Sequence, residues 1–160
     1  MSVHADLYFK DTFFSSGESG ILDEAGENVG MMDLHGLARA RVDIYGPEGE
    51  LRYIAKLMPF LLWWKVMNTA KEELGMLTLQ AALLKRKFKY DAGERGIYMI
   101  EAPAFTKEFV VAREGNEVAS LVKTNKFWSS SDAYRLHNES MLDAYELVAV
   151  AMGINALLRD

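Results

Sequence analysis

The chain has 160 residues, of which 50% are hydrophobic and 26% charged, and its formal net charge is −5 at pH 7. This length indicates one domain, and the acidic balance argues against a broad basic surface, so no nucleic acid is expected as a partner. Cysteine is absent, which excludes disulfides, thiolate catalysis and iron–sulfur clusters.

The chain's first residues, Met1–Asp6, lack the basic stretch and apolar core of a signal peptide. Together with the absence of cysteine, this pattern leads us to expect a cytoplasmic protein.

Alternation of apolar and polar residues dominates the first 140 residues, which is typical of strands that bury one face. Turns rich in Gly, Asp and Asn separate these runs, so we expect a meander of antiparallel hairpins. About twelve short strands are predicted, within residues 3–9, 13–23, 28–34, 38–45, 51–57, 62–68, 73–79, 84–90, 97–101, 105–112, 118–124 and 133–137.

The last segment, residues 141–158, is predicted to be a helix that begins at an N-cap on Ser140, with Asp143 in the capping-box position. From Leu147 to Leu158 only Gly153 and Asn155 interrupt the apolar residues. Such a helix lies inside protein or in lipid. Because a membrane span needs about 20 apolar residues, we expect burial in protein and no transmembrane span.

Strand number and helix polarity together predict the architecture. About eight strands make a barrel that its own side chains fill, whereas about twelve enclose a wider space. An apolar helix about 10–12 Å across would fill that space. We therefore predict a closed antiparallel β-barrel that encloses the C-terminal helix. The alternative is a two-sheet sandwich with the helix on one side, but that arrangement calls for a polar stripe, which Leu147–Ala151 lacks.

Several segments resemble the tubby-like superfamily, and specifically its LURF-one-related branch. They are 51–56 and 62–67, which resemble an internal repeat of that family, and 118–123, 127–129 and 132–136, followed by the apolar helix. The resemblance implies one domain over residues 1–160, with strands over 3–138 around a central helix over 141–158. This phospholipid-scramblase-like fold agrees with the architecture predicted above.

The resemblance implies little about activity. Tubby domains bind phosphoinositide headgroups through basic side chains, and phospholipid scramblases are linked to membranes and calcium. No headgroup-binding motif of the family can be matched to this chain. Where relatives often carry a basic run, this chain has Lys56 followed by an apolar stretch, which weakens the lipid-headgroup interpretation.

The densest basic cluster is Lys85-Arg86-Lys87-Phe88-Lys89. On a strand, Lys85, Lys87 and Lys89 share one face. That face could bind a phosphate-rich headgroup or an RNA backbone, or it could be a solvated face whose lysines discourage edge pairing. Its candidate anion-binding residues are Lys85, Arg86, Lys87, Lys89, Lys123 and Lys126, the last two joining only if the fold brings them close.

The apolar stretch Pro59–Trp64 breaks the alternation of the rest of the chain. If Leu62, Trp64 and Val66 point inward, Trp63 and Met67 lie outside. The candidate interaction patch is Phe60, Leu61, Trp63 and Met67, a partner or membrane-interface site. The alternative is that a loop or the N-terminal segment covers it.

Catalytic and metal-binding patterns are missing from the sequence. The histidines His4, His35 and His137 have no ligand spacing, and no nucleotide-binding fingerprint or EF-hand is present. We therefore expect no cofactor, no metal site and no catalytic residues.

Three functions are weighed. The first is a non-enzymatic module that binds anionic lipid headgroups or a membrane surface, and the second is a protein-interaction or oligomerisation scaffold that uses the aromatic patch. An enzyme with a loop site at one barrel end is third, which a pocket containing a buried, charge-paired carboxylate or histidine would favour. The oligomeric state stays open.

Overall fold

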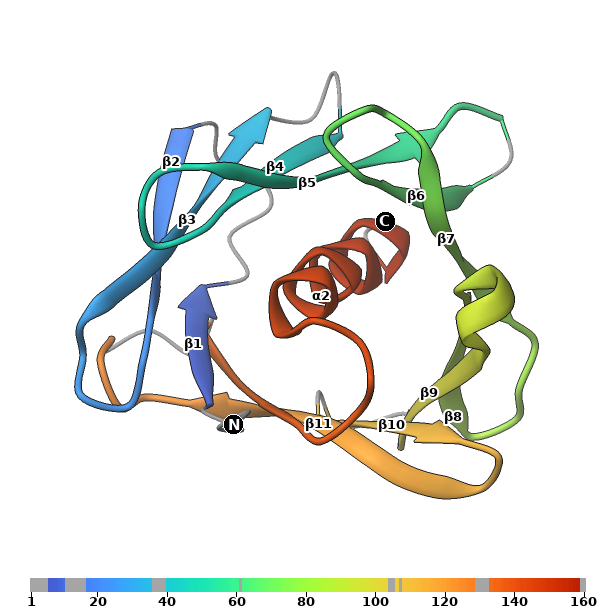
Figure 1. Cartoon of the computed structure of the whole chain (residues 1–160). Coiled ribbons are helices and arrows are strands. Elements are labelled where there is room, and N and C mark those ends of the chain that lie inside the picture. Colours follow the sequence, from blue (N-terminus) through green and yellow to red (C-terminus); the bar gives the residue numbers. More distant parts are fainter. Residues whose placement is uncertain are drawn as a thin grey trace.

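The computed structural model describes residues 6–10, 17–35, 40–60, 62–103, 106, 108–128 and 133–158. Its strands form one closed antiparallel barrel around the C-terminal helix, as predicted (Figure 1). Strands that follow each other in sequence pair in space, and β1 closes the ring against β12, which excludes the sandwich. The elements are β1 (Leu7–Lys10), β2 (Gly17–Leu22), β3 (Asn28–His35), β4 (Arg41–Tyr45), β5 (Leu51–Met58), β6 (Trp63–Met67), β7 (Glu73–Gln80), β8 (Lys85–Asp91), the 3-10 turn η1 (Gly93–Arg95), β9 (Ile97–Pro103), β10 (Phe109–Arg113), β11 (Asn116–Thr124), β12 (Ala133–Asn138) and α2 (Ala144–Leu158).

Side-chain alternation follows the predicted pattern and sorts each strand into an inward and an outward face. Phe88 and Tyr90 of β8 are fully buried inside the barrel, whereas Lys87 and Lys89 between and beside them face outward. In β3, Met32 and Leu34 point inward in the same way. The alternation of apolar and polar residues in the sequence therefore corresponds to the alternation of inward and outward side chains in the barrel wall.

The helix α2 fills the barrel interior, as predicted (Figure 1). Burial extends around its whole circumference from Leu147 to Ile154, and Val148 and Val150 are at most 1% exposed. This explains why the segment has no polar stripe. Among the described residues, no helix combines the length and the apolar character that crossing a bilayer requires.

The start of α2 differs from the prediction. The helix begins at Ala144, and its N-cap is Asp143, whose Oδ1 accepts the Tyr145 amide at 3.3 Å. The predicted N-cap, Ser140, is three residues too early. Its hydroxyl donates to Asn138 Oδ1 at 2.6 Å and accepts the Leu142 amide at 3.1 Å. Ser140 therefore stabilises the turn that precedes the helix.

The two ends of the barrel are built differently. The connections β2–β3, β4–β5, β6–β7, β8–β9 and β10–β11, together with residues 139–143 before α2, lie at one end, which we call the turn end. Register shifts near four of these turns mark β-bulges, which increase local twist. The other connections lie at the opposite end, the loop end, toward which α2 runs.

Candidate functional site

Four large apolar side chains are exposed at the loop end of the barrel, whereas the turn end exposes Met141 and, in part, Ile97. Phe60 and Leu62 belong to the β5–β6 connection, and Leu83 and Leu84 belong to the β7–β8 connection. All four are between 69% and 100% exposed. The two connections belong to successive hairpins, which are joined by the pairing of β6 with β7. Single exposed apolar residues are common, but several large ones at one end of a barrel make that end a candidate interaction site. We call these four residues the apolar tips.

Three of the four apolar tips have an unfavourable backbone conformation. Phe60, Leu62 and Leu84 have φ angles of 73°, 53° and 63°. This left-handed region costs a non-glycine residue about 1–2 kcal/mol. Such strain clusters at functional sites, where the surrounding fold over-determines it. The hairpins therefore keep bulky side chains in solvent although neither burial nor backbone preference favours that position.

Lysines line the outward wall behind the apolar tips. Lys85, Lys87 and Lys89 share the outward face of β8, as the alternation predicted, while Arg86 has the inward parity of Phe88 and so lies at the barrel mouth. Lys85 is ion-paired to Glu101 of β9, with 2.5 Å between Nζ and Oε1. The lysines of β8 therefore form a row of which one member is already neutralised.

Two further lysines lie on the outward wall, separated from β8 by β7. The sequence pattern does not mark Lys65 as a candidate, and there Lys56 only weakens the lipid-headgroup interpretation. Lys56 of β5 and Lys65 of β6 are direct cross-strand partners on the outward face. Within the described part of the chain neither has an ion-pair partner. Like charges opposite each other destabilise a sheet, so the pair has no structural benefit of its own. Only strand pairing could reveal it, because the two residues lie in different hairpin arms.

The candidate aromatic patch is exposed in part. Trp63 lies on the outward face, 41% exposed, in the register row that contains Met58 and Thr78. Met67 also faces outward, but it packs beside its cross-strand partner Ile54 and is only 4% exposed, so the exposed patch does not include it. Leu61 lies outside the described residues.

The structure does not bring Lys123 and Lys126 to the lysines of β8. Two strands, β9 and β10, separate β8 from β11. Lys123 lies 4.6 Å from the ring centroid of the buried Tyr134, and Lys126 lies 5.1 Å from that of Tyr8. Both cations therefore pack on aromatic rings elsewhere on the barrel. We define the basic belt as Lys56, Lys65, Lys85, Lys87 and Lys89.

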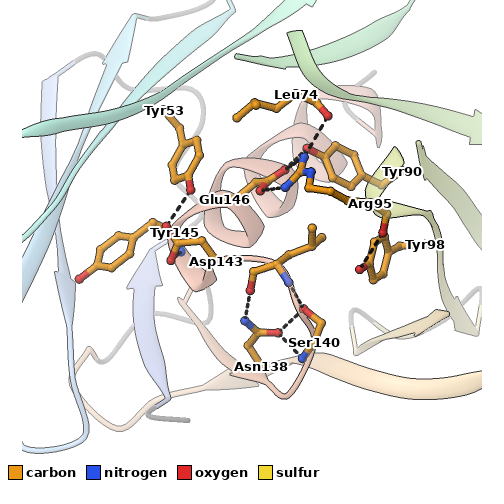
Figure 2. A network of polar contacts seen from close by, with 11 residues as sticks. Tyr53, Leu74, Tyr90, Arg95, Tyr98, Asn138, Ser140, Asp143, Tyr145 and Glu146 are labelled. Carbon is orange, nitrogen blue, oxygen red and sulfur yellow. Dashed lines mark hydrogen bonds and ion pairs between the residues drawn. The ribbon is translucent and has the colours of Figure 1, made fainter. Parts of the chain in front are cut away.

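At the turn end, the buried carboxylate of Glu146 is ion-paired to the partly exposed Arg95 (Figure 2). Glu146, in the first turn of α2, is 1% exposed. Arg95 of η1 donates to Oε1 at 2.7 Å and to Oε2 at 2.9 Å, and the Tyr90 hydroxyl donates to Oε2. Burial and the adjoining carboxylate raise the pKa of Tyr90 far above its usual range, and the hydrogen bond to Glu146 raises the pKa of Arg95.

More hydrogen bonds tie the start of α2 to the wall (Figure 2). The Tyr53 hydroxyl donates to Asp143 Oδ2 at 2.7 Å, and the Tyr145 hydroxyl donates to the Val29 carbonyl at 2.6 Å. Burial and the Asp143 hydrogen bond raise the pKa of Tyr53. The buried carboxylate that would favour an enzyme is thus present, but both oxygens of Glu146 are taken up by partners that anchor the helix.

Carboxylates concentrate at the turn end of the barrel, although Lys71 and Arg95 also lie there and Glu108 lies at the loop end. Each of the six connections at the turn end carries at least one carboxylate: Asp23, Glu48, Glu72, Glu94, Glu114 and Glu139. At the loop end, the described residues of the β5–β6 and β7–β8 connections are all uncharged. The chain is acidic overall, yet one end presents apolar tips above a basic belt, and the other presents a ring of carboxylates.

One group of possible metal ligands is found among the described residues. Asp33, His35 and Asp43 place their ligand atoms within 4.8 Å of one another on the outward face of β3 and β4. Asp43 also accepts Arg41 Nε at 2.9 Å, and His35 Nε2 lies 3.2 Å from Asp43 Oδ2. Arg41 and His35 both contact Asp43, and His35 Nε2 lies 3.7 Å from Asp33 Oδ2, so the group is a polar network across two strands. His4 lies outside the described residues.

Comparisons with known proteins establish the fold alone. No family model matches the chain, and no curated protein matches it in sequence. The fold is similar to the X-ray structure of a protein from Arabidopsis thaliana, AT5G01750, with a TM-score of 0.67 and 11% sequence identity. The match covers 97% of this chain and 91% of that chain, so the two share the barrel and the central helix over nearly their whole length.

Proposed function

We propose that this chain is a non-enzymatic binding module of the tubby-like type, in the LURF-one-related branch, that attaches to anionic membrane surfaces through its loop end. The observation that carries the proposal is the position of the apolar tips directly above the basic belt. Apolar groups that enter a membrane interface and cations that meet lipid phosphates are the two components of peripheral membrane attachment.

Neither component suffices by itself. Burying one large apolar side chain contributes about 1.5–3 kcal/mol, and a cation near an anionic surface contributes about 1 kcal/mol. The loss of translational and rotational freedom on binding offsets several of these contributions. The apolar tips and the basic belt together therefore favour binding that requires both an accessible bilayer interface and negative lipid charge.

The charge distribution supports one orientation on the membrane. An anionic surface attracts the loop end, where the basic belt lies, and repels the carboxylates of the turn end. Trp63 sits at the boundary between the apolar tips and the basic belt, and tryptophan favours the headgroup level of a bilayer. This orientation directs the end of α2 toward the membrane and its start away from it.

The non-enzymatic part of the proposal is supported by the interior. An active site needs convergent polar groups beside a space for substrate, whereas α2 occupies the centre of this barrel with apolar side chains. The polar groups that do converge, Glu146, Arg95 and Tyr90, are hydrogen-bonded to one another. Their arrangement favours a structural role.

Vesicle co-sedimentation tests the proposal. We expect binding to vesicles that contain phosphatidylserine, weaker binding at higher salt, and little binding to vesicles of phosphatidylcholine alone. The double variant Leu83→Ser/Leu84→Ser should lose most of the binding, and its melting temperature should remain that of the parent protein because both side chains are exposed. An absence of binding at low salt would rule the proposal out.

A protein partner is the second candidate, since the same exposed residues, Phe60, Leu62 and Trp63, could pack against another chain or a second copy. The oligomeric state and vesicle binding together distinguish the two candidates. A chain that elutes as a dimer, fails to bind vesicles and becomes a monomer after Trp63→Asp supports the scaffold. A monomer that binds vesicles supports the membrane module.

A further inference from the structure

A carboxylate of the neighbouring strand lies beside the loop-end lysines of β8. Glu101 of β9 is the direct cross-strand partner of Lys87 and forms its ion pair with Lys85. On its other side, in β10, Glu101 faces the apolar Val110. In the part of β8 and β9 nearest the loop end, Glu101 is therefore the one acidic side chain among the described residues.

Lys85 is the cation that this carboxylate neutralises, and its position matters for binding. Lys85 directly follows Leu84, so it is the member of the basic belt nearest to the apolar tips along the chain. A surface that receives Leu83 and Leu84 would meet Lys85 first. In the isolated protein the positive charge of Lys85 is balanced before any lipid arrives.

The ion pair is easy to open. The side chains of Lys85 and Glu101 are 45% and 38% exposed, and solvent-exposed pairs are only weakly stable. The hydrogen bond from Lys85 and the charge of Lys87 lower the pKa of Glu101, so the carboxylate remains charged at neutral pH. A lipid phosphate is negatively charged, as Glu101 is, and its oxygens can accept hydrogen bonds from Lys85.

We propose that Glu101 sets the density of anionic lipid that the membrane-binding end requires, by acting as a built-in counter-ion that headgroup phosphates displace from Lys85. The inference rests on the proposed function and refines it. It identifies the ligand as a dense array of anionic headgroups, because a row of lysines on a convex barrel wall spreads its charges and does not converge on one headgroup.

The central experiment compares two variants with the same change in net charge. Glu101→Gln removes the counter-ion, and Glu117→Gln removes an exposed carboxylate near the turn end of β11. Each is titrated with vesicles of increasing phosphatidylserine content. One additional effective cation at the surface corresponds to about a fivefold change in partitioning. We expect Glu101→Gln to bind about fivefold more tightly, with its midpoint at a lower phosphatidylserine fraction, and Glu117→Gln to change binding less than twofold.

A double-mutant cycle with Lys85→Gln isolates the pair. Lys85→Gln leaves the charge of Glu101 uncompensated, so this variant should bind about fivefold more weakly than the parent protein. Adding Glu101→Gln to Lys85→Gln should restore binding to about the parent level, whereas adding Glu117→Gln should restore it less than twofold. Equal recovery from the two added substitutions would overturn the role of Glu101 as counter-ion.

The outcomes distinguish this inference from the proposed function. If the parent protein binds anionic vesicles and Glu101→Gln behaves like Glu117→Gln, the counter-ion role is wrong and the membrane function stands. If the parent protein and the Glu101→Gln variant both fail to bind at every phosphatidylserine fraction, both proposals are wrong. Thermal unfolding of each variant shows whether it retains the parent fold.

Discussion

The indole of Trp64 lies directly against Gly153, in the middle of the barrel. Trp64 is fully buried on β6, and its Nε1 donates a hydrogen bond to the Ala149 carbonyl of α2 at 2.9 Å. A Cβ atom on Gly153 would stand 2.2 Å from Trp64 Cδ1. The glycine therefore gives the indole room to reach a helix carbonyl, and the contact fixes how deeply α2 sits in the barrel.

This contact makes the substitution Gly153→Ala destabilising. In an ordinary helix the change stabilises by about 1 kcal/mol. Here the added methyl group overlaps a fully buried ring, and overpacking a core costs about 1–3 kcal/mol. We expect the free energy of unfolding, measured in urea, to fall. In a Trp64→Phe background the same substitution should be less harmful, and a gain in stability in the parent protein would contradict the packing argument.

The substitution Glu146→Ala should lower the free energy of unfolding by about 3 kcal/mol, because breaking a buried ion pair leaves its partners without compensation. The partly exposed Arg95 can turn to solvent, which places the effect at the lower end of the usual range. Glu94→Ala, on the exposed neighbour of Arg95 in η1, is the matched control and should stay within about 0.5 kcal/mol of the parent protein. Equal effects of the two variants would show that the buried pair does not anchor α2.

Stability should depend on pH through His137. Its Nδ1 lies 2.7 Å from Asp6 Oδ1, and this contact raises the pKa of His137 above 6.5. A histidine whose pKa is raised by folding contributes stability that is complete below pH 6.5 and is lost as the pH rises through the folded-state pKa. We expect the melting temperature to fall slightly over that interval. The His137→Gln variant should lose this part of the pH dependence, and an unchanged profile would contradict the assignment.

Trp63 and Met67 should respond differently to the same substitution although both face outward on β6. Trp63→Ser removes a half-exposed ring, so we expect vesicle binding to weaken about tenfold or more, with little change in stability. Met67→Ser removes a covered side chain and should lower the free energy of unfolding by about 2–5 kcal/mol, while the folded fraction still binds vesicles. Loss of binding without loss of stability in Met67→Ser would reverse the assignment.

Local patterns in the sequence were sufficient for the architecture. Alternation with a period of two is a property of each strand by itself, so the strands and the inward side chains such as Phe88 and Tyr90 could be predicted from neighbours along the chain. The absence of a polar stripe on the last helix required a surrounding wall, and the number of strands provided one. The closed barrel with a central helix followed from these two local observations.

Tertiary structure decided every feature that depends on residues distant in sequence. Arg95 and Glu146 lie 51 residues apart, and no pattern along the chain pairs them. The register of β5 and β6 made Lys56 the partner of Lys65. The same register placed Ile54 beside Met67, so Met67 is covered although alternation alone predicts that it is exposed. Alternation assigns a face to each side chain, but exposure depends on what packs beside it across the sheet, and that is determined only when the strands associate.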